Sequence, residues 1–223
     1  MKILAVDTAL GACSAAILDG EMTLAHRCVA MERGHAEALA PMVDEAMREA
    51  GIAFAALDRL AVTTGPGTFT GQRVGLAFMR GLRVVLNKPL AGITTLQAMA
   101  EAAMEETGLS VAAALHDARR GEVYAYAGSR EREIVPLHLA PFAEALKEIF
   151  AALHEEPLAF AGTAAEAAAR DYEKLGGCAR LSAVRQPDAL WVARLAALLP
   201  EPVEVPHPLY LRAPDARLPV SSR

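Results

Sequence analysis

A glycine-rich segment, GPGTFTGQRVG, extends from Gly65 to Gly75 and joins an apolar run to a helical pattern. The run from Leu60 to Thr64 is typical of a buried strand, and apolar residues then recur at helical spacing from about Gln72 to Leu86. Glycines at such a junction permit positive φ angles, and Thr68 or Thr70 can cap the helix that follows. A strand that turns directly into a helix is the building unit of α/β folds.

The residues on either side of this loop predict the rest of one lobe. Apolar runs at Ile3 to Val6 and Ser14 to Leu18 indicate two paired strands, and a hairpin at Asp19-Gly20 leads into a third strand at Met22 to Val29. A helix is expected next, which Gly51 ends and which is either kinked or started near Pro41. Its apolar stripe is Leu39, Met42, Val43, Ala46, Met47 and Ala50. A strand at Leu90 to Ile93 and a helix from about Thr95 to Glu106 are expected to follow the glycine loop and its helix.

The second half repeats this order of elements. Val111 to Leu115 leads to Asp117 as the first strand leads to Asp7, and Leu158 to Ala161 precedes a glycine as the earlier strand precedes Gly65. Further elements are expected at Val123 to Ala127, Arg132 to Leu137 and Phe142 to Leu153, with a last helix after Gln186. A β-β-β-α-β-α unit used twice predicts the α/β actin-like, Hsp70-like and sugar-kinase (ASKHA) fold, with two related lobes of mixed sheets flanked by helices. We expect an N-terminal lobe at residues 1–105 and a C-terminal lobe at 106–223, whose last helix and tail pack back on the first lobe.

The composition narrows the class of function. The net charge is −5, with 22 Lys and Arg against 27 Asp and Glu, so the chain lacks the basic field with which a protein binds nucleic acid unaided. The cysteines Cys13, Cys28 and Cys178 have no CxxC spacing, which is typical of free thiols in a reducing compartment. Asp7 interrupts the apolar N-terminus, which we interpret as a strand, and no run reaches the roughly 18 to 20 apolar residues of a membrane helix. We therefore expect a cytoplasmic protein.

Two interpretations of the glycine loop stay open on the residues alone. The loop consists of Gly65, Pro66, Gly67, Thr68, Phe69, Thr70 and Gly71. A helix start with free backbone N–H groups is one way to bind an anion, although the chain has no Gly-Lys pair and therefore no P-loop. The other interpretation is a tight turn that packs the helix on the strand.

The helix behind the loop has more apolar surface than one sheet easily covers. Its stripe is Val74, Ala77, Phe78, Gly81, Leu82 and Val85, and Leu76, Met79 and Leu86 lie outside it. Gly75, Ala77 and Gly81 are small enough to admit a second helix at short range. The helix is either buried in its own domain or forms a subunit interface, and the width of the apolar surface favours the interface.

Residues with catalytic chemistry are few. Asp7 and Asp117 each end an apolar strand, where actin-like folds place phosphate or magnesium ligands. The run DARRGEVY after His116 is either a binding loop or a solvated turn, and the turn is favoured. A helical metal pair needs two histidines at i and i+4, whereas His35 is followed at that spacing by Leu39. With no GxSxG motif either, we expect no catalytic residue and no metal site.

Four signatures occur in order along nearly the whole chain: ILAVDT at Ile3 to Thr8, the glycine loop, DARRGEVY at Asp117 to Tyr124, and PLYLR at Pro208 to Arg212. In these the chain resembles the TsaB (YeaZ) family of tRNA threonylcarbamoyladenosine biosynthesis, part of the TsaD superfamily. The glycine loop is the most specific of the four. The chain departs from the common family pattern with Ala9, Ala36, Thr68 and Gln72, and Thr68 keeps the hydroxyl that capping needs.

The resemblance implies an actin-like protein that has lost catalysis. It implies a non-catalytic scaffold that dimerises with a TsaD-like transferase, which modifies adenosine 37 of ANN-decoding tRNAs to N6-threonylcarbamoyladenosine. A TsaE-like ATPase joins the pair, tRNA is bound through the complex, and ATP and metal are expected on the partner subunits, so no intrinsic cofactor is expected here. Because the family associates through its first two helices, the expected interface residues are His35, Leu39, Met42, Arg73, Val74, Ala77, Phe78 and Gly81. Asp7, Thr8 and Asp117 are then a vestigial nucleotide cleft, and the glycine loop mainly aims the interface helix.

Two other outcomes stay open. One is an enzyme, either an ATP-dependent protein of the actin-like class with magnesium at Asp7 and Asp117, or a metal-dependent glycoprotease, which the missing histidine pair disfavours. The other is a homodimer through the same helices when the partner is absent.

Overall fold

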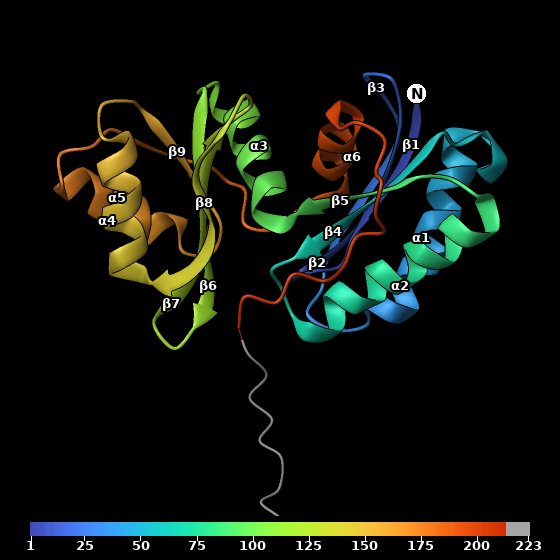
Figure 1. The fold of residues 1–223 in the computed structure, drawn as a ribbon, viewed down its shortest axis with the longest axis horizontal. Helices are drawn as coiled ribbons and strands as arrows, with labels where there is room; N and C mark the ends of the chain where they lie inside the picture. The colour runs from blue at the N-terminus through green and yellow to red at the C-terminus, as the bar shows by residue number, and fades with distance from the viewer. Residues whose placement is uncertain (213–223) are drawn as a thin grey trace, which may run out of the picture.

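The computed structural model describes residues 1–212; residues 213–223, the end of the expected C-terminal lobe, lie outside the described part. Two five-stranded sheets form the frame of the molecule (Figure 1). The first contains β1 (Lys2–Asp7), β2 (Ala12–Asp19), β3 (Met22–Ala30), β4 (Arg59–Gly65) and β5 (Leu90–Thr94), in the order β3-β2-β1-β4-β5. The second contains β6 (Val111–Arg119), β7 (Glu122–Ser129), β8 (Glu133–Pro141), β9 (Leu158–Ala161) and β10 (Ala179–Leu181), in the order β10-β9-β6-β7-β8.

The two sheets have the same plan. Each strand of the first corresponds to the strand five places later in the second, and the pairing directions agree. β1 runs antiparallel to β2 and parallel to β4, as β6 runs antiparallel to β7 and parallel to β9. This duplication confirms the predicted α/β fold class, the ASKHA fold.

The helices divide into an outer and an inner set. The outer helices are α1 (His35–Ala50) and α2 (Phe69–Leu86) on the first sheet, and α4 (Phe142–Leu153) and α5 (Ala165–Lys174) on the second. The inner helices are α3 (Thr95–Thr107) and α6 (Ala189–Leu198), which lie between the sheets (Figure 1). A short 3-10 turn at Phe54–Ala56 precedes β4. Among residues 1–212, no helix combines the length and the apolar character that crossing a bilayer requires.

The inner helices are exchanged between the halves of the chain. α3 was expected to complete the first lobe, but it packs mainly on β6, β7 and β9 of the second sheet. α6, from the end of the chain, packs on β1, β2 and β4. Side-chain alternation along β1 explains how both faces are covered: Leu4 and Val6 face the outer helices, and Ile3 and Ala5 face α6. We call the first sheet with α1, α2 and α6 the first lobe, and the second sheet with α3, α4 and α5 the second lobe.

Several element boundaries differ from the expectation for local reasons. α2 begins at Phe69, earlier than the apolar periodicity indicated, because the Thr68 hydroxyl accepts a hydrogen bond from the Gly71 amide and caps the helix. Pro41 lies inside α1, which begins at His35, so the helix does not start near Pro41 as one of the two predictions had it. α5 and β10 were not predicted, since α5 buries mostly alanines and β10 is a three-residue edge strand.

Candidate functional site

The glycine loop lies backbone to backbone on the connection between β1 and β2. A Cβ atom at Gly67 would be 2.3 Å from the Ala9 carbonyl oxygen, and one at Gly71 would be 2.2 Å from the Thr8 carbonyl oxygen. The Thr68 amide donates to that Ala9 oxygen at 2.8 Å, and the Thr8 hydroxyl donates to the Gly71 carbonyl at 2.7 Å. Close approach, rather than an open cradle, is therefore what requires glycine at these positions.

Several hydrogen-bond donors in the first turns of α2 bind groups of the protein itself. The Gly71 amide donates to the Thr68 hydroxyl at 3.0 Å, the Gln72 amide to the Thr68 carbonyl at 3.1 Å, and the Gly75 amide to the Thr8 hydroxyl at 3.0 Å. The Gln72 side chain is buried over Gly65. This arrangement favours the packing interpretation of the loop, which links the end of β1 rigidly to α2.

The side of α2 that faces away from the sheet carries small and apolar residues. We call it the outer face of α2, made of Arg73, Ala77, Gly81, Val84 and Val85. Val84 is 76% exposed and Val85 80%, and a Cβ atom at Gly81 would have no neighbour within 4 Å. The opposite side buries Leu76 and Met79 in the core of the first lobe. The outer face of α2 is therefore an exposed helix surface that is flat enough for another helix to approach closely.

The expected interface residues divide between this face and the core. Arg73, Ala77 and Gly81 are exposed, and Val74 and Phe78 are half-buried against the first core. His35, Leu39 and Met42 are buried beneath α1, where the His35 ring nitrogen Nε2 lies 3.0 Å from the Leu10 carbonyl oxygen. The side chains that α1 exposes are mostly charged: Glu37, Asp44, Glu45, Arg48 and Glu49. Val84 was not included in the expected set, although its exposure makes it part of the outer face.

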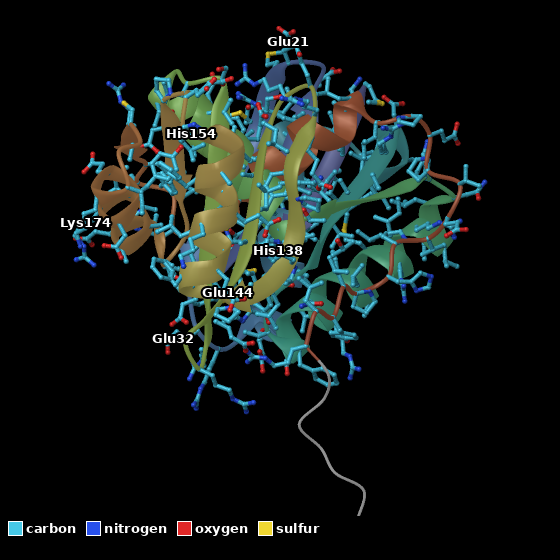
Figure 2. The ribbon with its side chains drawn as sticks, turned by 60° about the vertical axis from the view of Figure 1, so that its left-hand side comes forward. Glu21, Glu32, His138, Glu144, His154 and Lys174 are labelled. Atoms are coloured by element: carbon cyan, nitrogen blue, oxygen red, sulfur yellow. The ribbon has the colours of Figure 1, made fainter. Side chains whose placement is uncertain are left out.

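A cavity of about 720 Å³ lies between the lobes. Its charged lining residues are Glu32 and Arg33 from the first lobe, and Asp117 and Arg119 from the second. Gln186 reaches across it, and its side-chain oxygen accepts a hydrogen bond from the Gly11 amide at 2.9 Å. Figure 2 shows Glu32 at the lower end of the molecule, opposite Glu21. The charges at this cavity are balanced rather than cationic.

Asp7 and Thr8 lie outside this cavity lining and inside the core, whereas Asp117 is exposed at the cavity. One carboxylate oxygen of Asp7 accepts from the Thr63 hydroxyl at 2.5 Å and from the Ala9 amide at 3.2 Å, and the other oxygen has no partner. Burial raises the pKa of Asp7 to about 7, opposed by these two hydrogen bonds and assisted by the charge of Asp188.

These positions do not fit a magnesium nucleotide. Magnesium is held by carboxylates that reach its hydration shell, whereas the Asp7 carboxyl is enclosed in the core and lies outside the cavity lining. The Gln186 amide also occupies the space above Gly11. Burial lowers the pKa of His116, at the cavity floor, to about 4, so that this ring adds no positive charge for phosphate at neutral pH. Within residues 1–212, no group of three or more His, Cys, Asp or Glu side chains is placed to hold a metal ion.

The end of the described chain packs on the start of α2 through Tyr210. Tyr210 stacks on Phe69 with ring centroids 5.7 Å apart, and the Arg73 guanidinium lies 3.4 Å from the centre of the Phe69 ring. Arg73 also donates to the Tyr210 hydroxyl at 2.8 Å. The PLYLR signature marks this segment, but only the tertiary structure shows that it lies beside α2.

The duplicated sheets, the inner helices and the open cavity between the lobes define a two-lobed protein of the ASKHA class. The (R)-2-hydroxyglutaryl-CoA dehydratase component A of Acidaminococcus fermentans shares this fold at a TM-score of 0.51 and 13% identity, over 88% of this chain and 97% of that one. A family model described as TsaD, tRNA N6-adenosine threonylcarbamoyltransferase, matches residues 29–174. A Pseudomonas aeruginosa crystal structure, described as an uncharacterized protein with similarity to peptidase YEAZ, is 32% identical over 95% of this chain and 99% of that chain, with a TM-score of 0.81.

The curated relatives agree with these matches. The Escherichia coli (strain K12) tRNA threonylcarbamoyladenosine biosynthesis protein TsaB is 38% identical over 124 residues, which cover 56% of this chain and 53% of that protein. The Haemophilus influenzae protein of the same name is 40% identical over 125 residues. The chain belongs to the TsaB (YeaZ) family, as its four signatures predicted. It spans about half the length of the curated relatives it matches.

Proposed function

We propose that this protein takes part in the biosynthesis of N6-threonylcarbamoyladenosine in tRNA as a non-catalytic subunit. In this role it docks the outer face of α2 on a helix of a TsaD-like transferase and so supports transfer to adenosine 37. A TsaE-like ATPase and the tRNA join the same assembly, with ATP and metal held by the partner subunits. The observation that carries the proposal is the outer face itself: an exposed apolar helix surface with Ala77 and Gly81 at its centre.

The character of this face supports a helix as its occupant. Ala77 and Gly81 are one turn apart and have no bulk, so a second helix can approach to short interaxial distance. Val84 and Val85 would each lose a large exposed apolar area on docking, which is favourable by about 25 cal/mol for each Å² removed from water. α2 contains Arg73, Arg80 and Arg83 and no acidic residue, so an acidic partner surface would be complementary.

The position of His35 favours a packing role for α1 over a metal-binding role. His35 points into the core toward the Leu10 carbonyl, and the residue one turn later, Leu39, is buried in the same core. A metal held by a helical histidine pair would need both side chains on an accessible face.

The substitution Ala77→Glu tests the docking face. A carboxylate at the centre of a helix–helix contact would be desolvated without a partner, so co-purification with a TsaD-like transferase should fall at least tenfold. The matched control is Ala151→Glu, which places the same charge at an exposed alanine of α4 on the second lobe. Both variants should melt like the parent. Undiminished binding by Ala77→Glu would show that the outer face of α2 is not the interface.

The outer face of α2 can also form the expected homodimer. Without the transferase, two copies can bury their outer faces against each other, because a twofold arrangement brings the same residues together. Sedimentation velocity at increasing concentration should show a monomer–dimer equilibrium that Ala77→Glu shifts to monomer. A dimer unaffected by Ala77→Glu would place self-association on another surface.

A further inference from the structure

The segment from Pro206 to Arg212 runs along the first lobe after α6 and ends between the lobes (Figure 1). The Leu209 amide donates to the Thr64 carbonyl at 2.8 Å, directly before the glycine loop, which joins the segment's backbone to that of β4. Arg80 of α2 donates to the Pro206 carbonyl at 2.5 Å and lies 3.0 Å from the His207 ring nitrogen Nδ1.

Two further contacts hold this segment on the first lobe. Pro206 packs on Gly92 of β5, where a Cβ atom would be 2.6 Å from the proline ring. Tyr210 is held by Phe69 and by the Arg73 guanidinium at the start of α2. The segment is thus fastened to β4, β5 and α2 at several separate points.

Within residues 1–212, the hydrogen bonds and the ion pair that join this segment to the second lobe come from Arg212. The Arg212 guanidinium donates to the Ala118 carbonyl at 2.9 Å and pairs with the Glu122 carboxylate. Both side chains are partly buried, with 25% and 33% of their surface exposed. They lie at the hairpin between β6 and β7, whose Arg119 lines the inter-lobe cavity.

We propose that residues 206–212 form a strap that sets the angle between the two lobes, with Arg212 as its clasp on the β6–β7 hairpin. When Arg212 loses its contacts with Ala118 and Glu122, the contacts with the first lobe keep the strap in place. The β6–β7 hairpin then moves relative to the strap. Opening would widen the cavity between Arg33 and Arg119 and would leave the first lobe unchanged. The proposal concerns the free protein and does not depend on any partner.

A distance measurement between the lobes tests the clasp. In a Cys28→Ser background, nitroxide labels at Cys178 on the second lobe and at Glu21→Cys on the β2–β3 turn report the inter-lobe distance by pulsed electron resonance. Glu21 projects from the upper end of the molecule, away from the strap (Figure 2). Arg212→Ala should broaden the distance distribution and shift it to longer values, and Glu122→Gln should give a smaller shift because the Ala118 hydrogen bond remains.

The matched control is Arg130→Ala. Arg130 makes a comparable pair of contacts with Glu101 and Glu105, but all three residues belong to α3 and the β7–β8 turn, within the second lobe. This variant should keep the parental distribution. A parental distribution in Arg212→Ala as well would overturn the proposal. If Arg212→Ala loses its cooperative melt, Glu122→Gln decides: an unchanged distribution in that folded variant also overturns it.

Discussion

Folding changes the protonation of the Asp7 carboxyl group. It occupies the strand end where the fold class places phosphate chemistry, yet it is fully buried beside Thr63 and has one unpartnered oxygen. Its pKa rises from 3.8 to about 7 on folding, chiefly through burial. Between these values the folded state holds a proton that the unfolded state releases, so stability falls as the pH rises from about 4 to about 7.

Asp7→Asn should therefore stabilise the protein at alkaline pH. The amide keeps an oxygen for the Thr63 hydroxyl and the Ala9 amide and cannot ionise. The gain in unfolding free energy over the parent should be larger at pH 8 than at pH 5 by on the order of 3 kcal/mol, since each pKa unit corresponds to about 1.4 kcal/mol. Urea denaturation of both proteins at the two pH values measures this. A difference independent of pH would mean that Asp7 is ionised in the folded protein well below pH 7.

At the scale of the element, two glycines of α2 have opposite environments. Gly71 is pressed on the Thr8 carbonyl, whereas Gly81 on the outer face has open space around it. Gly71→Ala should destabilise the protein by about 3 kcal/mol, because the methyl group overlaps backbone that cannot move without displacing β1. Gly81→Ala should stabilise it by about 1 kcal/mol through helix propensity.

The midpoints of urea denaturation compare the stability of the two variants, provided that the dependence of the unfolding free energy on urea concentration is unchanged. Each variant is the control for the other. Equal midpoints would contradict the rigid seating of the glycine loop on the β1–β2 connection. Gly81→Ala also bears on docking, since even a methyl group there should weaken a close helix contact while the fold gains stability.

At the scale of the whole molecule, the exchange of α3 and α6 makes each half of the chain incomplete. A fragment of residues 1–108 retains the first sheet but lacks α6, so the face with Ile3, Ala5 and Ala16 is uncovered. The same fragment carries α3 without the second sheet on which it packs. Two apolar surfaces would then face water.

We expect fragment 1–108 to bind a hydrophobic dye and to lack a cooperative melt. Mixing it with fragment 109–212 should abolish the dye binding and restore the cooperative melt. Calorimetry and dye fluorescence measure the two effects, and the intact chain provides the reference. A sharp melt of fragment 1–108 alone would show that the first half is an independent domain and that α6 adds little to it.

The local sequence pattern was sufficient to predict most helices and strands and to identify the family. The alternation in Ile3 to Val6, the Asp19-Gly20 turn and the stripe of α1 predicted their strands, hairpin and helix, because these signals depend on residues close in the chain. The repeated order of elements predicted the fold class for the same reason. α5 escaped prediction because alanine is compatible with many environments.

Side-chain direction and long-range packing were decided only by the tertiary structure. The apolar residues of α2 did not reveal which of them face out, because Leu76 and Val85 differ in burial and not in chemistry. His35, Leu39 and Met42 lie in the core because α1 rests on the first sheet. The packing of α6 on β1, β2 and β4 joins segments more than a hundred positions apart, and Arg212 bonds to Ala118 94 positions earlier. No local pattern encodes contacts between segments so distant in the chain.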